Sequence, residues 1–517
     1  MKLEGKGRLI AAAALLAILL AGCSSAGGTS SAPSGGTTAH VGGTVTIGTN
    51  TDVYTFDPAK CGLGEGPQCA AVFGTLLIFD SASKKFVPRM AKSFVSSKDG
   101  LEWTLKLRPN VKFSDGTPFN ADAVIFNWNR IIDPATGSPS AALASTIAWH
   151  KVDDLTINLD LKQPNYQLPW ALTYSFGMIG SPAGIKAAGA NVGTTPVGAG
   201  PFVLANWAHQ SEMKFTRNPK YWDSPRPYLD NLNFKIITAD DLRADALRNN
   251  EIQIDLGYVG KVAHQLVGEG FVDAVDPAFV GSGLQMSAAL PFVKDPDVRL
   301  AFAKLLDAKQ IVDALYPEEV IPKKLIGDGL PFSNSVSLPK HDVAGAQKLI
   351  DAYLKRTGQK SITVNFEYAA NSTLVGQLAV LVQAQLEKAK GVTVTVTPLD
   401  PAAESAAAAA GKVAIEQGGI FGSNPDALYD TFHSGGALNS SHYSSPALDK
   451  QLELTRSAPT VAERDAAYSK AVDLISSANL LIPYRRTDTH WTHAANVHGV
   501  IARDSIQLDV DQISISK

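Results

Sequence analysis

The chain has 517 residues, of which 45% are hydrophobic and 18% charged, and its formal net charge at pH 7 is −3. This length exceeds what one hydrophobic core usually holds, so we expect two or three domains. The mildly acidic balance lacks the basic footprint of a nucleic-acid-binding protein, so no nucleic-acid partner is expected.

The N-terminal segment 1–22 has the pattern of a signal peptide, with basic residues before an apolar run at 9–20. The alternative, a membrane-spanning anchor, needs roughly twenty apolar residues, and this run is shorter. The run ends in Leu20-Ala21-Gly22-Cys23, which resembles the lipobox of bacterial lipoproteins. This resemblance implies that Cys23 is lipidated and becomes the N-terminus, and that lipid is the chain's only link to the membrane.

Residues 24–38 consist almost wholly of Ser, Gly, Thr, Ala and Pro, a composition with too little apolar surface to fold. We therefore expect a flexible tether over 23–40 and a folded part that begins near Val41. Cys61 and Cys69 are left as a pair in an oxidising compartment, which favours a disulfide bond around a glycine-rich loop. The alternative is two free thiols.

The folded part carries patterns of both strands and helices. Alternating apolar residues predict strands at 43–48, 101–107 and 152–161. Asn120 is a candidate cap for a helix whose apolar face holds Val124, Trp128 and either Ile131 or Ile132. Helical periodicity marks 297–316, 343–355 and 374–388, and strands are predicted at 362–368 and 392–398.

Two helices near the C-terminus have recognisable starts. Pro446 follows Ser445 at a first helical position, and Thr460 with Glu463 forms a capping box for a helix that reaches about Ile475. Because strands alternate with helices in this half, the expected fold class is α/β (mixed α+β) in more than one lobe.

No enzyme motif stands out. Gly-x-Ser-x-Gly, His-Glu-x-x-His and Walker A patterns do not occur, whereas Ser-x-x-Lys occurs at 81–84 and again at 211–214. The first match has the setting of a hairpin turn, so we expect no enzyme and no cofactor, and a secreted hydrolase remains the less favoured alternative. His490, His493 and His498 are possible metal ligands, but residues three apart in a strand face opposite sides, which favours structural roles and no metal site.

An ordered series of motifs resembles the peptide/nickel family, family 5 or cluster C, of solute-binding proteins of bacterial ABC importers, which includes oligopeptide and dipeptide receptors. The resemblance covers about residues 43–517. Its landmarks are Thr55-Phe56-Asp57-Pro58, Phe73-Gly74-Thr75-Leu76-Leu77, the segments 86–91 and 99–108, Asp115-Gly116-Thr117-Pro118 with the following 119–124, Val197 to Phe202, Arg217 to Trp222, Pro291-Phe292 with Asp297-Val298-Arg299, and Leu481 to Tyr484.

The resemblance implies a two-lobed, type II periplasmic-binding-protein-like fold with an additional domain, hinged around a buried cleft. On this template domain I comprises 41–78, 196–285 and 489–517, domain II comprises 79–195, and domain III comprises 286–488. The implied function is capture of peptides or peptide-like solutes by a monomer on the outer face of the cell membrane. The implied partners are a permease and its ATPase subunits.

The resemblance also implies which segments line the cleft. One wall is the loop Cys61, Gly62, Leu63 and Gly64, where glycines allow close approach to a ligand. An external turn is the alternative for this loop. The facing wall is the segment of Ile420, Phe421, Gly422, Ser423, Asn424 and Asp426. Tyr258 and Gln285 are further candidate contacts.

The facing wall departs from the family pattern at one position. Peptide-binding members carry an aromatic residue where this chain has Ile420, and then an aspartate that pairs with the α-ammonium of the peptide. Here no carboxylate follows until Asp426. The alternative ligand is therefore a non-peptide such as a metal chelate, a glycoside or a modified amino compound. If a free amino terminus is bound, Asp426 is the first candidate partner.

Overall fold

The structure is a computed structural model that describes residues 40–62, 66–327, 332, 334–370, 373–420, 424–503 and 507–517. The expected signal peptide, Cys23 and the tether up to residue 39 lie outside the described residues. Within the described ranges, no helix combines the length and the apolar character needed to cross a membrane.

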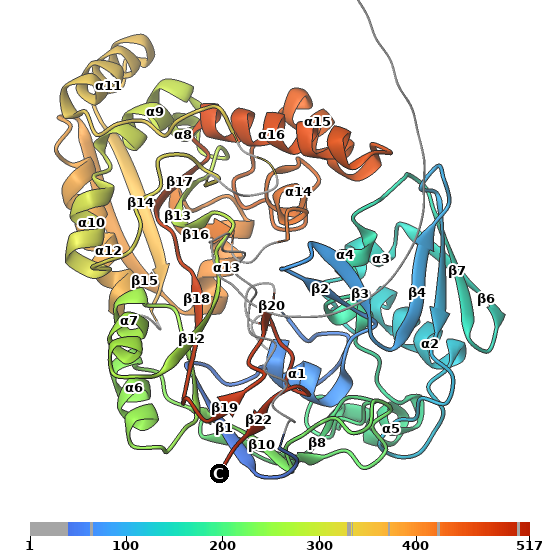
Figure 1. Ribbon diagram of the computed structural model, residues 1–517. Coiled ribbons are helices and arrows are strands. Elements are labelled where there is room, and N and C mark those ends of the chain that lie inside the picture. The colour runs from blue at the N-terminus through green and yellow to red at the C-terminus, as the bar shows by residue number, and fades with distance from the viewer. Residues whose placement is uncertain are drawn as a thin grey trace, which may run out of the picture. The chain divides into compact units, whose positions relative to one another are not determined.

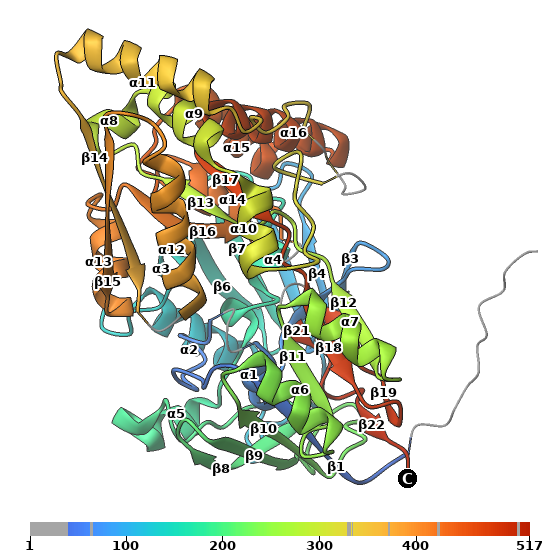
Figure 2. The ribbon, with the colours of Figure 1, turned by 90° about the vertical axis from the view of Figure 1, so that its left-hand side faces the viewer.

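The largest sheet has seven strands in the order β12-β18-β11-β1-β10-β9-β8 (Figure 2). The first strand forms where alternation predicts it, with Val45 and Ile47 fully buried, and it runs parallel to β10 and β11. Helices α6 (Asp240–Arg248) and α7 (Gly260–Gly268) follow β10 and β11 in the chain. The strands are β1 (Thr44–Thr49), β8 (Phe202–Ala208), β9 (Glu212–Arg217), β10 (Asn231–Ile236), β11 (Ile254–Gly257), β12 (Val272–Asp276) and β18 (Thr489–His493).

A four-stranded antiparallel sheet has the order β4-β5-β7-β6 and belongs to a separate hydrophobic cluster. Its strands are β4 (Ala91–Ser96), β5 (Glu102–Leu107), β6 (Ile147–Asp153) and β7 (Thr156–Leu161). The single strand predicted at 152–161 is therefore wrong. The chain turns after Asp153, whose Oδ1 accepts a hydrogen bond from the backbone N–H of Leu155 at 2.8 Å, and this aspartate turn outweighs the apolar alternation.

Helix α2 (Ala121–Ile132) covers this cluster and begins as predicted. Asn120 Oδ1 accepts a hydrogen bond from the N–H of Ala123 at 3.0 Å, which caps the helix. Trp128 is fully buried and stacks on Phe176, with ring centroids 4.7 Å apart. Of the two isoleucines left open by periodicity, Ile131 is buried and Ile132 is exposed.

The third sheet has five strands in the order β15-β14-β16-β13-β17. Strands β14 and β15 are parallel and are joined through α12, as the predicted strand-helix-strand order requires (Figure 2). The elements are β13 (Gly281–Met286), α9 (Pro296–Leu305), α10 (Ala308–Leu315), α11 (Val343–Thr357), β14 (Ile362–Ala369), α12 (Thr373–Leu386), β15 (Val392–Leu399), α13 (Pro401–Ala409), β16 (Ile415–Ile420) and β17 (Leu481–Arg485).

One helix predicted in this region is divided in two. The periodic stretch 297–316 forms α9 and α10, because the chain leaves the helical conformation at Leu306, whose φ and ψ are −70° and 120°. Asp307 then starts α10, and its side chain accepts a hydrogen bond from the N–H of Gln310 at 3.1 Å. The two helices stay in phase, which is why periodicity alone could not separate them.

A further cluster is built on α14 (Ala427–Phe432), α15 (Pro446–Ser457) and α16 (Val461–Ala478). Ser445 caps α15 with Pro446 in its first turn, and Thr460 and Glu463 form the predicted capping box of α16. Tyr468 of α16 stacks on Phe332 within this cluster, with centroids 4.6 Å apart.

Two connections join the seven-stranded and five-stranded sheets. The chain passes from β12 to β13 and returns from β17 to β18, and because β12 pairs with β18 and β13 with β17, the connections run side by side (Figure 1). Ser282 Oγ and Thr487 Oγ1 lie 2.7 Å apart across them. Strand β13 belongs to the five-stranded sheet, although the domain boundaries expected from the sequence place 281–285 with domain I.

The remaining elements are short. They are α1 (Gly66–Phe73), the hairpin of β2 (Leu77–Asp80) and β3 (Lys85–Pro88), α3 (Ala141–Ala144), α4 (Leu168–Ala171), α5 (Pro182–Ala188), α8 (Pro291–Lys294), and the two-stranded pairs β19 (Val497–His498) with β22 (Ser514–Ile515) and β20 (Ala502–Arg503) with β21 (Gln507–Leu508). Residues 81–84, the first Ser-x-x-Lys match, form the turn between β2 and β3.

Candidate functional site

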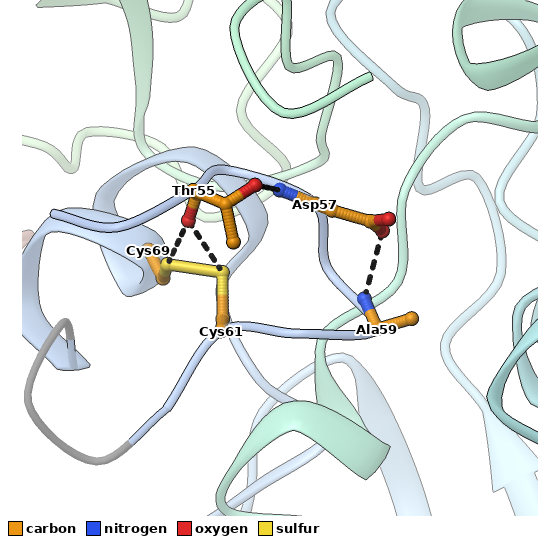
Figure 3. The surroundings of a disulfide bond; sticks show 5 residues. All are labelled: Thr55, Asp57, Ala59, Cys61 and Cys69. Atoms are coloured by element: carbon orange, nitrogen blue, oxygen red, sulfur yellow. Dashed lines mark hydrogen bonds between the residues drawn. A yellow bond between two sulfur atoms is a disulfide. The ribbon is translucent and has the colours of Figure 1, made fainter. Parts of the chain in front are cut away.

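The two cysteines expected to pair are joined by a disulfide bond with a Cα–Cα distance of 6.3 Å (Figure 3). Cys61 is the first residue of the candidate loop and Cys69 lies inside α1, and both are buried. Their sulfur atoms lie 3.9 Å and 4.0 Å from the carbonyl oxygen of Thr55. Gly62 follows Cys61, whereas Leu63 and Gly64 lie outside the described residues.

The start of this loop is fixed by a buried ion pair. Arg130 of α2 donates two hydrogen bonds to the carboxylate of Asp57, at 2.9 Å and 2.8 Å. The same carboxylate accepts from the N–H of Ala59, and the carbonyl oxygen of Asp57 accepts from the N–H of Cys61 at 3.1 Å (Figure 3). The aspartate of the Asp57-Pro58 motif therefore holds the disulfide loop against the helix of the neighbouring sheet.

Gln285 lies in β13 and its side chain is engaged within the protein. Its Nε2 donates to Ser440 Oγ at 2.7 Å, and Ser440 Oγ donates in turn to Glu416 on β16. Burial raises the pKa of Glu416 above its usual value, with only partial relief from the Ser440 hydrogen bond. Gln285 thus ties neighbouring segments of the five-stranded sheet together.

Tyr258 lies in the loop after β11, close to the two connections. Burial raises the pKa of its hydroxyl to about 12. Its carbonyl oxygen lies 3.4 Å from Nη1 of Arg485, which comes from the end of β17. The loop after β11 of the seven-stranded sheet therefore contacts the last residue of β17 in the five-stranded sheet.

Arg485 is a buried cation with incomplete pairing. Its nearest carboxylate is Glu319, with 3.7 Å between Nη1 and Oε1, and its guanidinium lies 3.9 Å from the ring centroid of Tyr316. Within the described part of the chain, its Nε has no hydrogen-bond partner. A buried guanidinium usually has its donors satisfied, so this side chain has capacity for a further acceptor.

The described part of the facing wall is held by internal contacts. The side chain of Ile420 is buried among the α14–α16 cluster, and its carbonyl oxygen accepts from the N–H of Val280 at 3.2 Å. Asn424 Oδ1 accepts from the N–H of Asp426 at 2.9 Å. Phe421, Gly422 and Ser423 lie outside the described residues.

Asp426 has an internal partner. Arg456 of α15 donates from Nε and Nη2 to the two carboxylate oxygens of Asp426, at 2.8 Å and 2.9 Å, and from Nη2 to Asp430 at 3.1 Å. The guanidinium also lies 3.4 Å from the ring centroid of Tyr429. Burial opposes the charge on Arg456, but the two carboxylates outweigh it and raise the pKa of the guanidinium. Asp426, the first candidate partner for a ligand ammonium, is therefore already paired with Arg456 in this structure.

Residues 85–440 match the family described as bacterial extracellular solute-binding proteins, family 5 Middle. The chain belongs to family 5. Members lie outside the cytoplasm and serve as the substrate-binding components of ABC importers, which also contain a permease and an ATPase. The family expected from the motif order is confirmed.

Three known proteins illustrate the similarity. The glutathione-binding protein GsiB of Escherichia coli (strain K12) is 26% identical over 427 residues, which are 79% of this chain and 82% of that protein. The binding protein AgaA from A. tumefaciens R10, solved with agropinic acid, has a TM-score of 0.80 and 22% identity over 92% of this chain and 99% of its own. DppA from Helicobacter pylori, solved with the peptide STSA, has a TM-score of 0.78 and 23% identity over the same shares. These neighbours confirm the type II fold.

The histidines of this family 5 protein make structural contacts. His490 Nδ1 lies 2.7 Å from Asp273 Oδ2 on the neighbouring strand β12, and His493 Nδ1 lies 2.9 Å from the carbonyl oxygen of Ala494. His498 Nε2 lies 3.2 Å from Ser516 Oγ. Across the described ranges, no group of three or more His, Cys, Asp or Glu residues is arranged to hold a metal ion.

The family motifs did not identify Arg485, Arg456 or Ser440. Arg485 carries a weak sequence signal, since a charged residue at the end of the apolar segment 481–484 needs a partner when that strand is buried. Arg456 carries none, because a basic residue in the last turn of a helix is also ordinary surface chemistry.

Proposed function

We propose that this family 5 protein captures peptides or peptide-like solutes outside the membrane, while a lipid on Cys23 anchors it, and delivers them to a permease. The observation that carries the proposal is the similarity, over 79% of the chain, to a protein that binds glutathione. Glutathione is a tripeptide with an unusual side-chain linkage, and it therefore belongs to the peptide-like class.

The proposed cleft lies between the sheets that the two connections join. One wall is the disulfide loop of Cys61, Gly62, Leu63 and Gly64, and the other is the segment from Ile420 to Asp426, with Tyr258 and Gln285 as supporting residues. Glycine-rich backbone suits a ligand that is recognised through its main chain. A ligand that touches both walls favours the closed form, and the closed form is what the permease recognises.

A second candidate ligand is a compound without a free α-ammonium group. The observation that favours it is the ion pair between Asp426 and Arg456, which leaves the first candidate carboxylate already occupied. A buried ammonium without a partner would cost several kcal/mol, about the penalty for an unpaired buried ion. AgaA shows that this fold also binds agropinic acid.

Arg485 supports a ligand that carries an acidic group. Its unpaired Nε–H can donate a hydrogen bond to a carboxylate, and both peptides and glutathione have at least one carboxylate. Arg485 lies at the end of β17, where the two sheets are joined. A solute bound between these sheets would contact this position.

Native mass spectrometry of the purified protein tests the proposed ligand class. A series of masses that fragment as peptides of mixed sequence, or glutathione itself, supports the proposal. A single non-peptide compound supports the second candidate. Turnover of added peptides to cleaved products would contradict both and return the chain to the hydrolase alternative.

The lipid anchor makes a separate prediction. Cys23→Ala should release the protein from the membrane fraction or leave its signal peptide uncleaved, because the thioether forms on that sulfur. Fractionation and immunoblotting of wild type and variant measure this. Correctly processed variant that stays in the membrane fraction would show that another feature holds the protein there.

A further inference from the structure

The C-terminal end of α15 contacts the loop that precedes α4, which belongs to the four-stranded sheet. The N–H of Tyr166 donates to the carbonyl oxygen of Arg456 at 2.8 Å, and Nε2 of Gln167 donates to the carbonyl oxygen of Thr455 at 3.1 Å. The guanidinium of Arg464, from α16, lies 5.0 Å from the ring centroid of Tyr166. We call this set of three interactions the α15 contact.

The contact joins two otherwise separate hydrophobic clusters. Tyr166 packs against the cluster of the four-stranded sheet, whereas α15 and α16 belong to the cluster beside the five-stranded sheet. The last carbonyl groups of a helix find no N–H donor within the helix, and they lie at the negative end of its dipole. Donors from another segment are therefore favourable partners at this end of α15.

Arg456 takes part in the α15 contact and also binds Asp426 of the proposed cleft wall. Its backbone carbonyl accepts from Tyr166, while its side chain is held by Asp426, which lies just before α14. Its guanidinium also covers the ring of Tyr429 in α14. One residue thus connects the segment 424–426 of the proposed cleft wall to the loop of the four-stranded sheet.

We propose that Asp426 and Arg456 are positioning residues for solute capture, which couple residues 424–426 of the proposed cleft wall to the α15 contact. The inference rests on the proposed function. With the ion pair intact, the end of α15 presents its carbonyl groups where Tyr166 and Gln167 reach them, so the lobes close most readily when this ion pair is formed. Asp426 acts on closure through Arg456 and not as a partner of the ligand.

Hydrogen–deuterium exchange of the full chain, extensively dialysed and with no solute added, tests this coupling. The amide of Tyr166 donates only across the α15 contact among the bonds described, so its exchange rate reports how often the contact opens. In Asp426→Asn the exchange of this amide should accelerate by about tenfold, the effect of losing one charge-assisted hydrogen bond. Amides within α15 and α16 should keep their wild-type rates.

Two further variants complete the experiment. Gln167→Leu removes one hydrogen bond of the contact directly. It should accelerate hydrogen exchange at the Tyr166 amide and leave the exchange rates of α14 unchanged. Asp449→Asn is the matched control, because Asp449 is on α15 too, but its carboxylate accepts only from the exposed Ser434, at 2.9 Å and 2.7 Å. It should leave the Tyr166 amide unchanged.

Three results would overturn the inference. In Asp426→Asn, the Tyr166 amide could keep its wild-type exchange rate. Alternatively, all amides of α14–α16 could exchange faster in that variant, which would show that the pair of Asp426 and Arg456 only stabilises these helices. The control Asp449→Asn could also accelerate exchange at the Tyr166 amide as strongly as Asp426→Asn does. None of these results depends on which solute co-purifies. The exchange experiment therefore tests the coupling, and mass spectrometry tests the proposed function independently.

Discussion

His490, a single side chain on β18, has a pKa that its neighbours shift. Burial disfavours the protonated imidazole of His490, but the hydrogen bond and charge of Asp273 outweigh burial and raise its pKa above the usual value. Asp488 and Glu319 act in the same direction, and the ring of His264 lies 6.3 Å away. His490 is therefore a charged partner of Asp273 over a wider pH range than a free histidine.

This raised pKa predicts a pH-dependent contribution to stability. A folded-state pKa above the unfolded value near 6.5 gives stabilisation that is complete below the unfolded pKa and lost as pH rises through the folded pKa. His490→Gln should therefore lower the melting temperature more at pH 5.5 than at pH 8.5, as measured by calorimetry. His150→Gln, which alters an exposed pair with Asp160, is the control and should show no such difference. Equal losses at both pH values would contradict the prediction.

At the scale of elements, the disulfide and the ion pair of Asp57 with Arg130 fix the same loop from two ends. The bond closes a loop that ends in the second turn of α1, and the ion pair joins its start to α2. Both interactions restrain the described residues at the two ends of the proposed cleft loop, 57–62 and 66–69.

The disulfide itself predicts a loss of stability on removal. Closing a loop of this length restricts the unfolded chain by roughly 2–3 kcal/mol, so Cys61→Ser with Cys69→Ser should lower the free energy of unfolding by about that amount. Urea titration followed by circular dichroism measures it. In the unreduced, denatured wild type neither cysteine should react with a thiol reagent, and two reactive thiols would refute the bond.

At the scale of the whole molecule, two features join separate parts of the fold: the paired connections between sheets and the α15 contact. The connections lie between β12 and β13 and between β17 and β18. The contact between 166–167 and 455–456 joins segments of the two other clusters. In the proposed function, a solute that bridges the two walls would add its own contacts to those of the α15 contact.

The ligand prediction belongs to this scale. Because Asp426 is paired with Arg456, acetylating the amino terminus of a peptide that binds should weaken binding by less than about tenfold. A receptor that pairs the ammonium in a buried site would lose about 2–5 kcal/mol instead. Calorimetry with one co-purified peptide in free and acetylated forms separates the two. A large loss would show that a carboxylate other than Asp426 pairs with the ammonium group.

Local patterns in the sequence were enough to predict much of the secondary structure. The cap at Asn120, the capping box at Thr460 and the parallel strands at 362–368 and 392–398 depend on residues close in sequence. The same information failed where a turn interrupts a continuing pattern, as after Asp153 and at Leu306. A single aspartate or one extended residue changes the chain direction without changing the apolar period.

The sequence by itself determined the family, the mixed α/β class and the pairing of Cys61 with Cys69, because each depends on motif order, periodicity or residue count. Only the tertiary structure decided that Asp426 is paired with Arg456, thirty residues away on another helix, and that Gln285 binds Ser440. Charge pairing between distant segments depends on how sheets and helices pack. A carboxylate has the same sequence signature whether a ligand or a buried arginine neutralises it.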